Sequence, residues 1–318
     1  MWNLHCKYIG SMKTNFIIIT KIGMEGVMKS EIKKKKEKML NRLIYFFIVI
    51  NIILACVYII MNFSLKKEAI EERELLNSIN LDENIILSND ENIEVHLTET
   101  QKKQDVNKEE EENINKLTER ILKVKKLQEE NEDIVGWIEI ENTNINYPVL
   151  QGDDNEYYLT HNYKKEKSQK GSIFLTKDYD WSLPSDNLLI YGHNIMNGLM
   201  FQDLLKYSDE EFYESHPIIH FTTENKDVEF EIFSVFKSRV FYKSEKNVFR
   251  YYDFVNADTE EEYNEFVEKA KESSLYDIDI TAEYGEQLIT LVTCSYHTED
   301  GRFIVIGKEK WNLGDYLK

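Results

Sequence analysis

Positive charge is scarce over most of this chain. The 318 residues contain 39 Lys and Arg against 58 Asp and Glu, and the imbalance is uneven. Residues 1–64 hold 10 cationic and 3 acidic side chains, so the remaining residues hold 29 against 55, a net charge of −26. Nucleic-acid binding requires basic patches. This balance therefore argues against a nucleic-acid partner and indicates a solvated acidic surface.

Metal-binding motifs and internal repeats are also lacking. The two acidic candidates are DDNE at 153–156 and the run at 258–272, and neither has the spacing of an EF-hand loop. The only biased tract is a charged stretch between residues 62 and 112. We therefore expect no metal site and no cofactor.

Charge is absent altogether from residues 43–61, which read LIYFFIVINIILACVYIIM. This run is about as long as a helix needs to be to cross a bilayer. The segment before it, EIKKKKEKMLNR, carries five Lys and one Arg, and such clusters stay in the cytoplasm. The pattern predicts a single-pass anchor at 43–61, a cytoplasmic tail at 1–42, and the bulk of the chain outside the cell membrane.

A cleaved signal peptide is the alternative reading of this apolar run. The run is longer than a usual signal-peptide core, and no small-x-small cleavage site follows it. Residues 1–27 show no convincing periodicity, whereas MKSEIKKKKEK, beginning at Met28, resembles a natural start. We interpret residues 1–27 as an over-extended start.

Aromatic residues are nearly missing from residues 62–112, where Phe63 is the only one. A segment rich in Glu, Lys, Asn and Asp cannot bury much apolar surface. It is predicted to be a stalk, partly helical or disordered. From residue 113 apolar residues recur at steps of three and four, which indicates a helix and the start of a packed domain at 113–318.

Short apolar or alternating runs bounded by turn residues predict eight strands in this domain. They lie at 136–141, 145–151, 171–176, 187–193, 218–223, 228–241, 287–294 and 302–308. A helix is predicted at 258–272, where Thr259 and Glu262 fit a capping box. We expect a mainly β fold, a closed barrel or a sandwich, with a helix before it and a helical insert before the last two strands.

Cysteine is scarce as well, and only Cys294 lies in the exterior part, since Cys6 precedes the anchor and Cys56 lies within it. An exterior cysteine without a second one to pair with is a candidate for reactivity. The alternative is a buried side chain acting as a small hydrophobe. Cys294 ends an apolar run instead of lying in its middle, which favours a functional role.

Arg302 opens the next strand after the turn SYHTEDG. If the two strands pair as a hairpin, the side chains of Cys294 and Arg302 emerge together at one rim. A guanidinium there would favour a thiolate and would offer donors to an oxyanion. The alternative role for Arg302 is a surface ion pair with Glu299 or Asp300.

A catalytic thiol also needs a proton acceptor and donor. His193 ends the apolar run NLLIYGH and is predicted to stand at a strand end on the rim. His297, three residues after Cys294, is the rival base. His220 reads as an ordinary strand residue, and His161 and His216 lie in polar, helix-like contexts.

Three features together resemble the signature of the sortases, membrane-anchored cysteine transpeptidases of Gram-positive bacteria. They are TLVTC at 290–294, an Arg that opens the following strand, and YGHN about 100 residues upstream. The helix before the barrel, the run at 131–163 and the insert at 258–272 resemble class B in particular. The resemblance covers about residues 113–318, and the anchor suits the same family.

This resemblance implies an eight-stranded sortase-type β-barrel in which Cys294 is the nucleophile, His193 the general acid and base, and Arg302 the group that holds the substrate carbonyl and oxyanion. Class B members often have an acidic residue soon after the Cys. Here Ser295 and Tyr296 follow, so no auxiliary role is expected for such an acid.

The implied reaction cleaves a C-terminal sorting motif of secreted proteins after Thr, through a thioacyl intermediate, and transfers them to a peptidoglycan amine. Motifs of the Asn-Pro-Gln-Thr-Asn type, or relatives ending in Thr-Gly, are typical of class B. Two other classes stay open. One is a membrane-anchored cysteine endopeptidase that only hydrolyses, and the other is a noncatalytic surface-binding protein with a structural Cys294.

Overall fold

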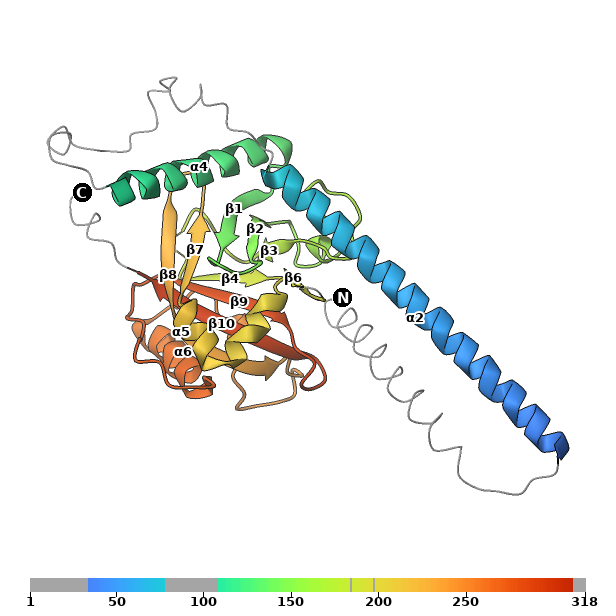
Figure 1. Ribbon diagram of the computed structural model, residues 1–318. Coiled ribbons are helices and arrows are strands. Elements are labelled where there is room, and N and C mark those ends of the chain that lie inside the picture. The colour runs from blue at the N-terminus through green and yellow to red at the C-terminus, as the bar shows by residue number, and fades with distance from the viewer. Residues whose placement is uncertain (1–33, 78–107, 184, 197, 311–318) are drawn as a thin grey trace, which may run out of the picture.

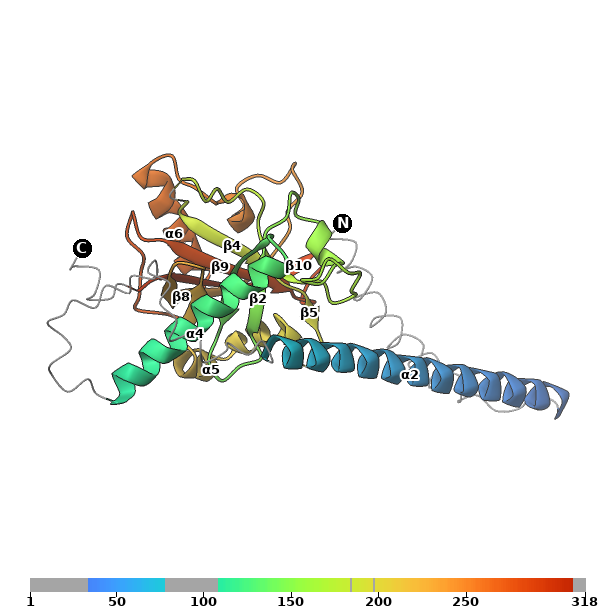
Figure 2. The ribbon, with the colours of Figure 1, turned by 90° about the horizontal axis from the view of Figure 1, so that it is seen from above.

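Residues 34–77, 108–183, 185–196 and 198–310 are described by the structure, a computed structural model (Figure 1). The expected over-extended start at 1–27 lies outside the described residues, as does most of the expected stalk. Helix α2 spans Lys34–Asn77 and extends well beyond the barrel in both views (Figures 1 and 2). It contains the expected anchor and continues into the first part of the stalk.

Within α2, the stretch at 42–67 is apolar enough and long enough to cross a membrane. It is the one helix among the described residues that meets this test, which rests on length and composition. A membrane span and a signal sequence both satisfy it.

The domain that follows begins with helix α4, and short helices lie between several of its strands. Its elements are α4 (Lys108–Glu130), β1 (Ile134–Glu139), β2 (Asn146–Leu150), η2 (Tyr157–Leu159), β3 (Ile173–Leu175), β4 (Asn187–Tyr191), β5 (Asn194–Ile195), β6 (Leu199–Met200), η3 (Gln202–Ser208), α5 (Glu210–Ser215), β7 (Ile218–Thr222), β8 (Asp227–Arg239), η4 (Tyr251–Asp253), α6 (Glu260–Ser273), β9 (Leu288–Cys294) and β10 (Gly301–Glu309).

Eight of these strands close into a barrel in the order β1-β2-β3-β4-β9-β10-β8-β7. The pairs β2/β3 and β4/β9 are parallel and the others antiparallel, and β7 closes the barrel against β1. Each of the eight strands lies within or within two residues of a run predicted from sequence. The barrel is confirmed over the sandwich. Strands β5 and β6 form a separate two-stranded sheet.

Side chains along the strands point alternately to the inside and the outside of the barrel. They form one interior core and two outer clusters. Side chains such as Ile190, Leu291 and Phe303 share the interior core, to which all eight strands contribute. The neighbours one residue along point outward, because successive side chains in a strand alternate between faces. Val292 and Ile304 therefore belong to an outer cluster that packs against α6.

Helix α6 begins with the capping arrangement expected from sequence. The Thr259 hydroxyl accepts a hydrogen bond from the Glu262 backbone N–H at 3.3 Å, and the Glu262 carboxylate accepts one from the Asp258 N–H at 2.9 Å. The apolar face of α6, Tyr263, Phe266, Val267 and Ala270, is buried. This face of α6 packs against the outside of β8, β9 and β10. The insert therefore borders the outer face of the sheet, where the candidate site described below lies.

Candidate active site

The ends of three neighbouring strands bring the sequence-predicted residues together. Cys294, the last residue of β9, and Arg302, near the start of β10, are Cα partners across the antiparallel pair. On the other side of β9, strand β4 runs parallel, with Tyr191 opposite Val292. Continuing that register by two residues brings His193 level with Cys294.

Hydrogen bonds beyond the end of β4 hold this register. The Gly192 N–H donates to the Val292 carbonyl at 3.0 Å. The Thr293 hydroxyl donates to the Gly192 carbonyl at 2.8 Å, and the Asn194 side-chain amide donates to the Cys294 carbonyl at 2.9 Å. The backbones that carry the histidine and the cysteine are therefore fixed to each other, although they are about 100 residues apart in sequence.

The same alternation that sorts the core places these side chains on one face. Cys294 lies two residues after the outward-facing Val292, and Arg302 lies two residues before the outward-facing Ile304. His193 lies two residues after Tyr191, which packs against the outer clusters. With a side-chain period of two, all three point to the outer face of the sheet formed by β4, β9 and β10.

A backbone carbonyl fixes the orientation of the His193 imidazole. Its Nε2 atom lies 2.8 Å from the carbonyl oxygen of Leu159. A carbonyl oxygen can only accept a hydrogen bond, so Nε2 carries the proton and Nδ1 is the basic nitrogen of the neutral ring. No side-chain pattern could indicate this contact, because every residue has a main-chain oxygen.

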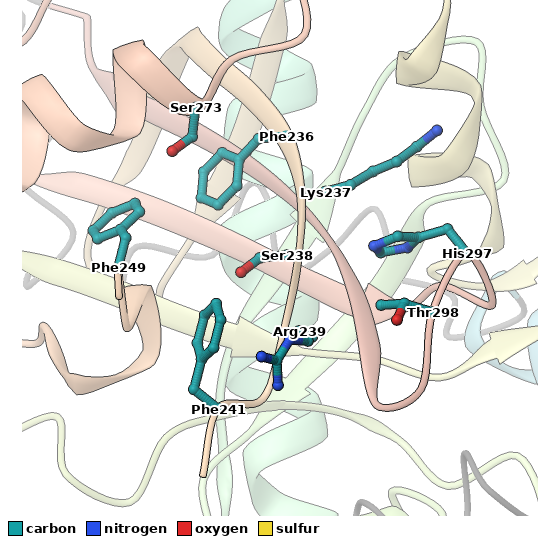
Figure 3. Close-up of a pocket in the computed structure, with 9 residues that line it drawn as sticks. All are labelled: Phe236, Lys237, Ser238, Arg239, Phe241, Phe249, Ser273, His297 and Thr298. Atoms are coloured by element: carbon teal, nitrogen blue, oxygen red, sulfur yellow. The ribbon is translucent and has the colours of Figure 1, made fainter. Parts of the chain in front are cut away.

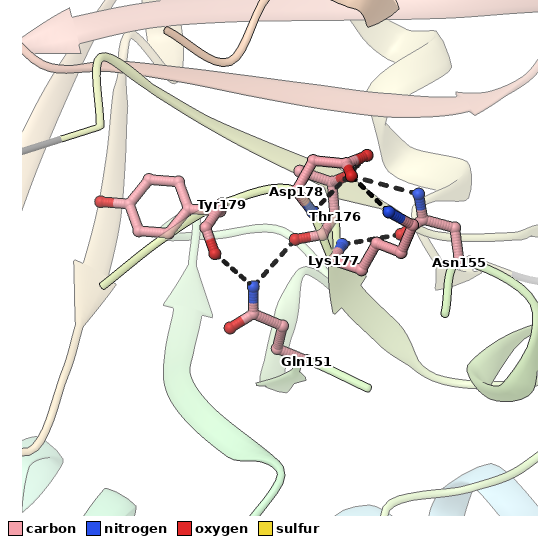
Figure 4. A network of polar contacts seen from close by, with 6 residues as sticks. All are labelled: Gln151, Asn155, Thr176, Lys177, Asp178 and Tyr179. Carbon is pink, nitrogen blue, oxygen red and sulfur yellow. Dashed lines mark hydrogen bonds and ion pairs between the residues drawn. The ribbon is translucent and has the colours of Figure 1, made fainter. Parts of the chain in front are cut away.

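A polar network holds the residues that precede Leu159 in place (Figure 4). The Gln151 side-chain amide donates to the carbonyls of Thr176 and Tyr179 at 2.9 and 2.8 Å, and the Asn155 side-chain oxygen accepts from the Lys177 N–H at 2.8 Å. These bonds tie the segment that leads into η2 to the loop between β3 and β4. The segment that carries the Leu159 carbonyl is therefore held by hydrogen bonds to the loop between β3 and β4.

Gly171 supports the same segment from the other side. Its φ is +59°, and a Cβ there would lie 2.5 Å from the Tyr158 carbonyl oxygen and 2.7 Å from that of Leu159. Both the left-handed conformation and the close approach require glycine. The Leu159 oxygen is therefore set by packing as well as by hydrogen bonds.

The guanidinium of Arg302 lies in a shielded, tyrosine-rich environment. Its Nη1 donates to the carbonyls of Asp300 and Gly301 at 3.1 and 3.0 Å, which orients the planar fork. Burial lowers the pKa of Arg302 from its usual value, and the nearby side chains of Tyr251, Asp300 and Tyr191 oppose this effect. An arginine stays charged in proteins, so this is a cation held in a medium of low polarity.

The exposure of the three side chains differs from the expected rim position. Cys294 and His193 are each 2% exposed and Arg302 is 1% exposed. The strand-end placement is as predicted, but the expectation that the side chains emerge openly at the rim is wrong. For Arg302 the physical reason is that the side chains of Tyr251, Tyr191 and Tyr296 lie near its guanidinium. Arg302 is accordingly not a surface group, as the ion-pair alternative required.

The rival base, His297, lies in the turn that joins β9 to β10, where it is exposed. Its Nδ1 is 2.9 Å from the Ser295 hydroxyl. Partial burial of the ring and then the charge of Lys237 lower the pKa of His297. It lines a pocket together with Lys237 and Ser238 of β8 (Figure 3).

Two of the other domain histidines have local partners, whereas the Nδ1 atom of the third, His220, is buried with no hydrogen-bond partner among the described residues. His161 stacks on Tyr157, His216 caps α5 and lies against Phe212, and His220 sits within β7. In the described ranges, no three His, Cys, Asp or Glu side chains gather in a way that could hold a metal ion.

Comparison with known proteins gives one family throughout. The family described as Sortase domain matches residues 138–310. Sortase B of Listeria monocytogenes is 38% identical over 190 residues, which cover 57% of this chain and 72% of that protein. Among solved structures, Clostridium perfringens sortase B has a TM-score of 0.53 at 33% identity, covering 59% of this chain and 99% of that one. A Staphylococcus aureus sortase B-substrate complex has a TM-score of 0.53 at 26% identity, covering 64% and 98%.

Proposed function

The chain belongs to the sortase family and is a class B cysteine transpeptidase, and from this premise we propose that Cys294, His193 and Arg302 carry out its reaction on a C-terminal sorting motif. The observation that carries the proposal is the register of β4, β9 and β10. It sets these three residues level on adjacent strands and on one face. A nucleophile, a base and an oxyanion donor are what acyl transfer through a thioester requires.

In the first half-reaction the Cys294 sulfur attacks the carbonyl carbon of the motif Thr. The thiol proton passes to Nδ1 of His193, and the carbonyl electron pair moves to oxygen, where the Arg302 guanidinium stabilises the charge. Collapse of this intermediate breaks the peptide bond. His193 returns the proton to the leaving amine, and the acyl group stays on sulfur as a thioester.

In the second half-reaction an amine of a peptidoglycan precursor attacks the thioester. His193 accepts the proton of the attacking amine, a new amide bond forms, and the Cys294 sulfur leaves and is regenerated as a thiol. The burial of the site supports transfer over hydrolysis, because a site that limits water lets an amine compete for the thioester. The substrate is then a secreted protein that becomes attached to the cell wall.

Ligation of a peptide to an amine tests this proposal. The full chain, kept in reducing buffer, is incubated with a peptide that contains Asn-Pro-Gln-Thr-Asn or a Thr-Gly relative, with and without a peptidoglycan-type amine. We expect cleavage after Thr and, with the amine, a ligated product detected by mass spectrometry. Cleavage that never gives a ligated product would identify a hydrolase instead, and no cleavage of any such peptide would refute the sorting function.

We further propose that α2 anchors the protein with its catalytic domain outside the membrane. The support is the apolar stretch at 42–67 and the lysine cluster that precedes it. Protease added to intact, wall-stripped cells should degrade the domain, whereas a cytoplasmic control protein should survive. Complete protection of the domain until lysis would reverse this orientation.

A further inference from the structure

Two basic segments flank the barrel end at which β4 and β9 finish, called the site end below. Strand β3 begins at the site end, because it is antiparallel to β4, and β8 ends there, because it is antiparallel to β10. The first segment, residues 163–170, leads into β3, and the second, residues 237–250, completes β8 and follows it. In the barrel order β3-β4-β9-β10-β8 they are four strand spacings apart, about 19 Å. The ends of β4 and β9 lie between them.

These segments are basic in a domain that is otherwise acidic. Together they contain nine Lys and Arg and two acidic residues. The turn between β9 and β10 adds Glu299 and Asp300, which leaves the three segments with a net charge of +5. Residues after 64 carry −26 in all, so those outside the three segments carry −31. An anionic partner is therefore repelled by most of the domain and attracted to the site end.

Exposed lysines supply this charge. Those of the two segments are Lys164, Lys167, Lys237, Lys243 and Lys246. Among the described residues none of these five forms an ion pair, whereas Lys165 pairs with Asp133 and Arg239 with Glu245. The five ammonium groups keep their charge available for a partner outside the chain.

The second segment presents its tip as a fixed turn. The Glu245 N–H donates to the Tyr242 carbonyl at 3.0 Å, and the Tyr242 N–H donates to the Glu245 carboxylate at 2.7 Å. Arg250 donates to the carbonyls of both residues at 2.9 and 2.6 Å. The turn carries Lys243 and Lys246 beside Tyr242, whose side chain is 64% exposed. Cationic side chains next to an exposed tyrosine are typical of segments that bind the headgroup layer of a membrane.

A contact with α2 indicates which way the site end faces. The Tyr58 hydroxyl donates to the sulfur of Met196 at 3.0 Å, and Figure 2 shows α2 passing close to β5. Met196 follows β5 and lies three residues after His193, so it belongs to the site end. Tyr58 lies three residues before the end of the uncharged run at 43–61. With the domain outside, this is the outer boundary of the bilayer, where tyrosine is common.

We propose that the site end of the barrel docks on the outer surface of the membrane, with the two basic segments on anionic phospholipid headgroups and Tyr242 in the headgroup layer. The inference rests on the proposed anchoring by α2. One helix tethers a domain without orienting it, and two basic segments about 19 Å apart add two further contacts, which together define a plane. A bilayer is an extended anionic surface that reaches both segments, whereas a small anion reaches only one.

Docking in this orientation leaves the candidate site open. The side chains of Cys294, His193 and Arg302 point to the outer face of the sheet, which is roughly perpendicular to the docked end. Substrate can therefore enter from the side, parallel to the membrane surface. The nucleophile is held next to the bilayer at a fixed height.

A tryptophan at the tip of the second segment tests the docking. The full chain is reconstituted in vesicles of phosphatidylglycerol or of phosphatidylcholine, each with acyl chains brominated near the headgroup. The signal is the extra fluorescence of Tyr242→Trp over the unsubstituted chain. We expect strong quenching in the anionic vesicles, weak quenching in the zwitterionic ones, and loss of the difference in 1 M salt, where the Debye length is about 3 Å.

Charge reversal in the same Tyr242→Trp chain gives the expected size. Each cation near an anionic surface contributes about fivefold to binding, so Lys243→Glu with Lys246→Glu should lower the ratio of docked to undocked chains at least tenfold. The matched control is Lys177→Glu with Lys226→Glu, an equal change of charge on exposed lysines at the opposite end of the barrel. It should leave the quenching unchanged.

Three results would overturn the proposal. They are equal quenching in the two kinds of vesicle, quenching that survives reversal of Lys243 and Lys246, and quenching lost equally in the control. A response of the tip tryptophan to soluble polyphosphate, with none to phosphatidylglycerol, would assign the lysines to a wall polyanion and also refute docking.

Extraction with alkaline carbonate separates this inference from the proposed anchoring. A chain that stays in the vesicles but shows no lipid-dependent quenching keeps its anchor and refutes the docking. A chain that carbonate releases has no anchor. Its salt-sensitive binding to phosphatidylglycerol vesicles, lost on reversal of Lys243 and Lys246, would still support the docking surface.

Discussion

Replacement of Cys294 with alanine is expected to abolish cleavage of a sorting-motif peptide, with a loss on the order of 10⁴- to 10⁶-fold, as when a covalent nucleophile is removed from other acyl-transfer enzymes. Cys294→Ser should be nearly as inactive, because a hydroxyl is far less ionised than a thiol near neutral pH. Initial rates with a fluorogenic peptide in reducing buffer measure both variants.

The control for this experiment is Cys56→Ala, which removes an exposed cysteine of α2 and should leave the rate unchanged. Thermal unfolding followed by circular dichroism checks that Cys294→Ala keeps its fold, since losing one sulfur atom changes the buried volume little. Appreciable turnover by a folded Cys294→Ala chain would refute the covalent mechanism.

Replacement of His193 with alanine is expected to cost about 10²- to 10⁴-fold in kcat/KM, the usual contribution of general acid–base catalysis. The reason is the register that sets His193 level with Cys294, together with the Leu159 carbonyl that leaves Nδ1 as the basic nitrogen. His297→Ala, on the other side of the hairpin, should cost much less. Both variants are measured with one peptide under identical conditions.

Arg302→Lys completes the series, because lysine keeps the charge and loses the planar fork. A loss of about 10²-fold or more is expected if the guanidinium holds the oxyanion. A severe loss in His297→Ala beside a mild one in His193→Ala would make His297 the base. It would also show that the likeness of YGHN to the family signature is misleading here.

Much of the fold was predictable because the pattern of residues over short stretches of sequence indicates where strands and helices lie. Apolar alternation located all eight barrel strands, and Thr259 with Glu262 located the start of α6. The barrel order was not contained in local pattern. It depends on pairings such as β4 with β9, which join segments about 100 residues apart in sequence.

The candidate site was predictable in its residue types and less so in its environment. Strand ends marked Cys294, His193 and Arg302. His193 was preferred to His297 as the base, but turn geometry alone did not exclude His297, because no local pattern shows which strand lies beside β9; the choice stays a prediction. All three side chains are buried, which the sequence pattern did not predict; for Arg302 the groups nearby include Tyr251 of η4, some 50 residues away in sequence. The Leu159 carbonyl was missed because main-chain atoms leave no mark in the sequence.

The parallel pairing of β4 with β9 also governs when the site can exist during folding. The β3/β4 hairpin is local, whereas β9 can join β4 only after a loop of about 100 residues has closed. Closing such a loop costs entropy before any contact is gained, and contacts of this kind form late. A chain that has collapsed around its first strands therefore carries a histidine without its cysteine. If Cys294 and His193 act together as proposed, the site therefore exists only once the barrel has closed.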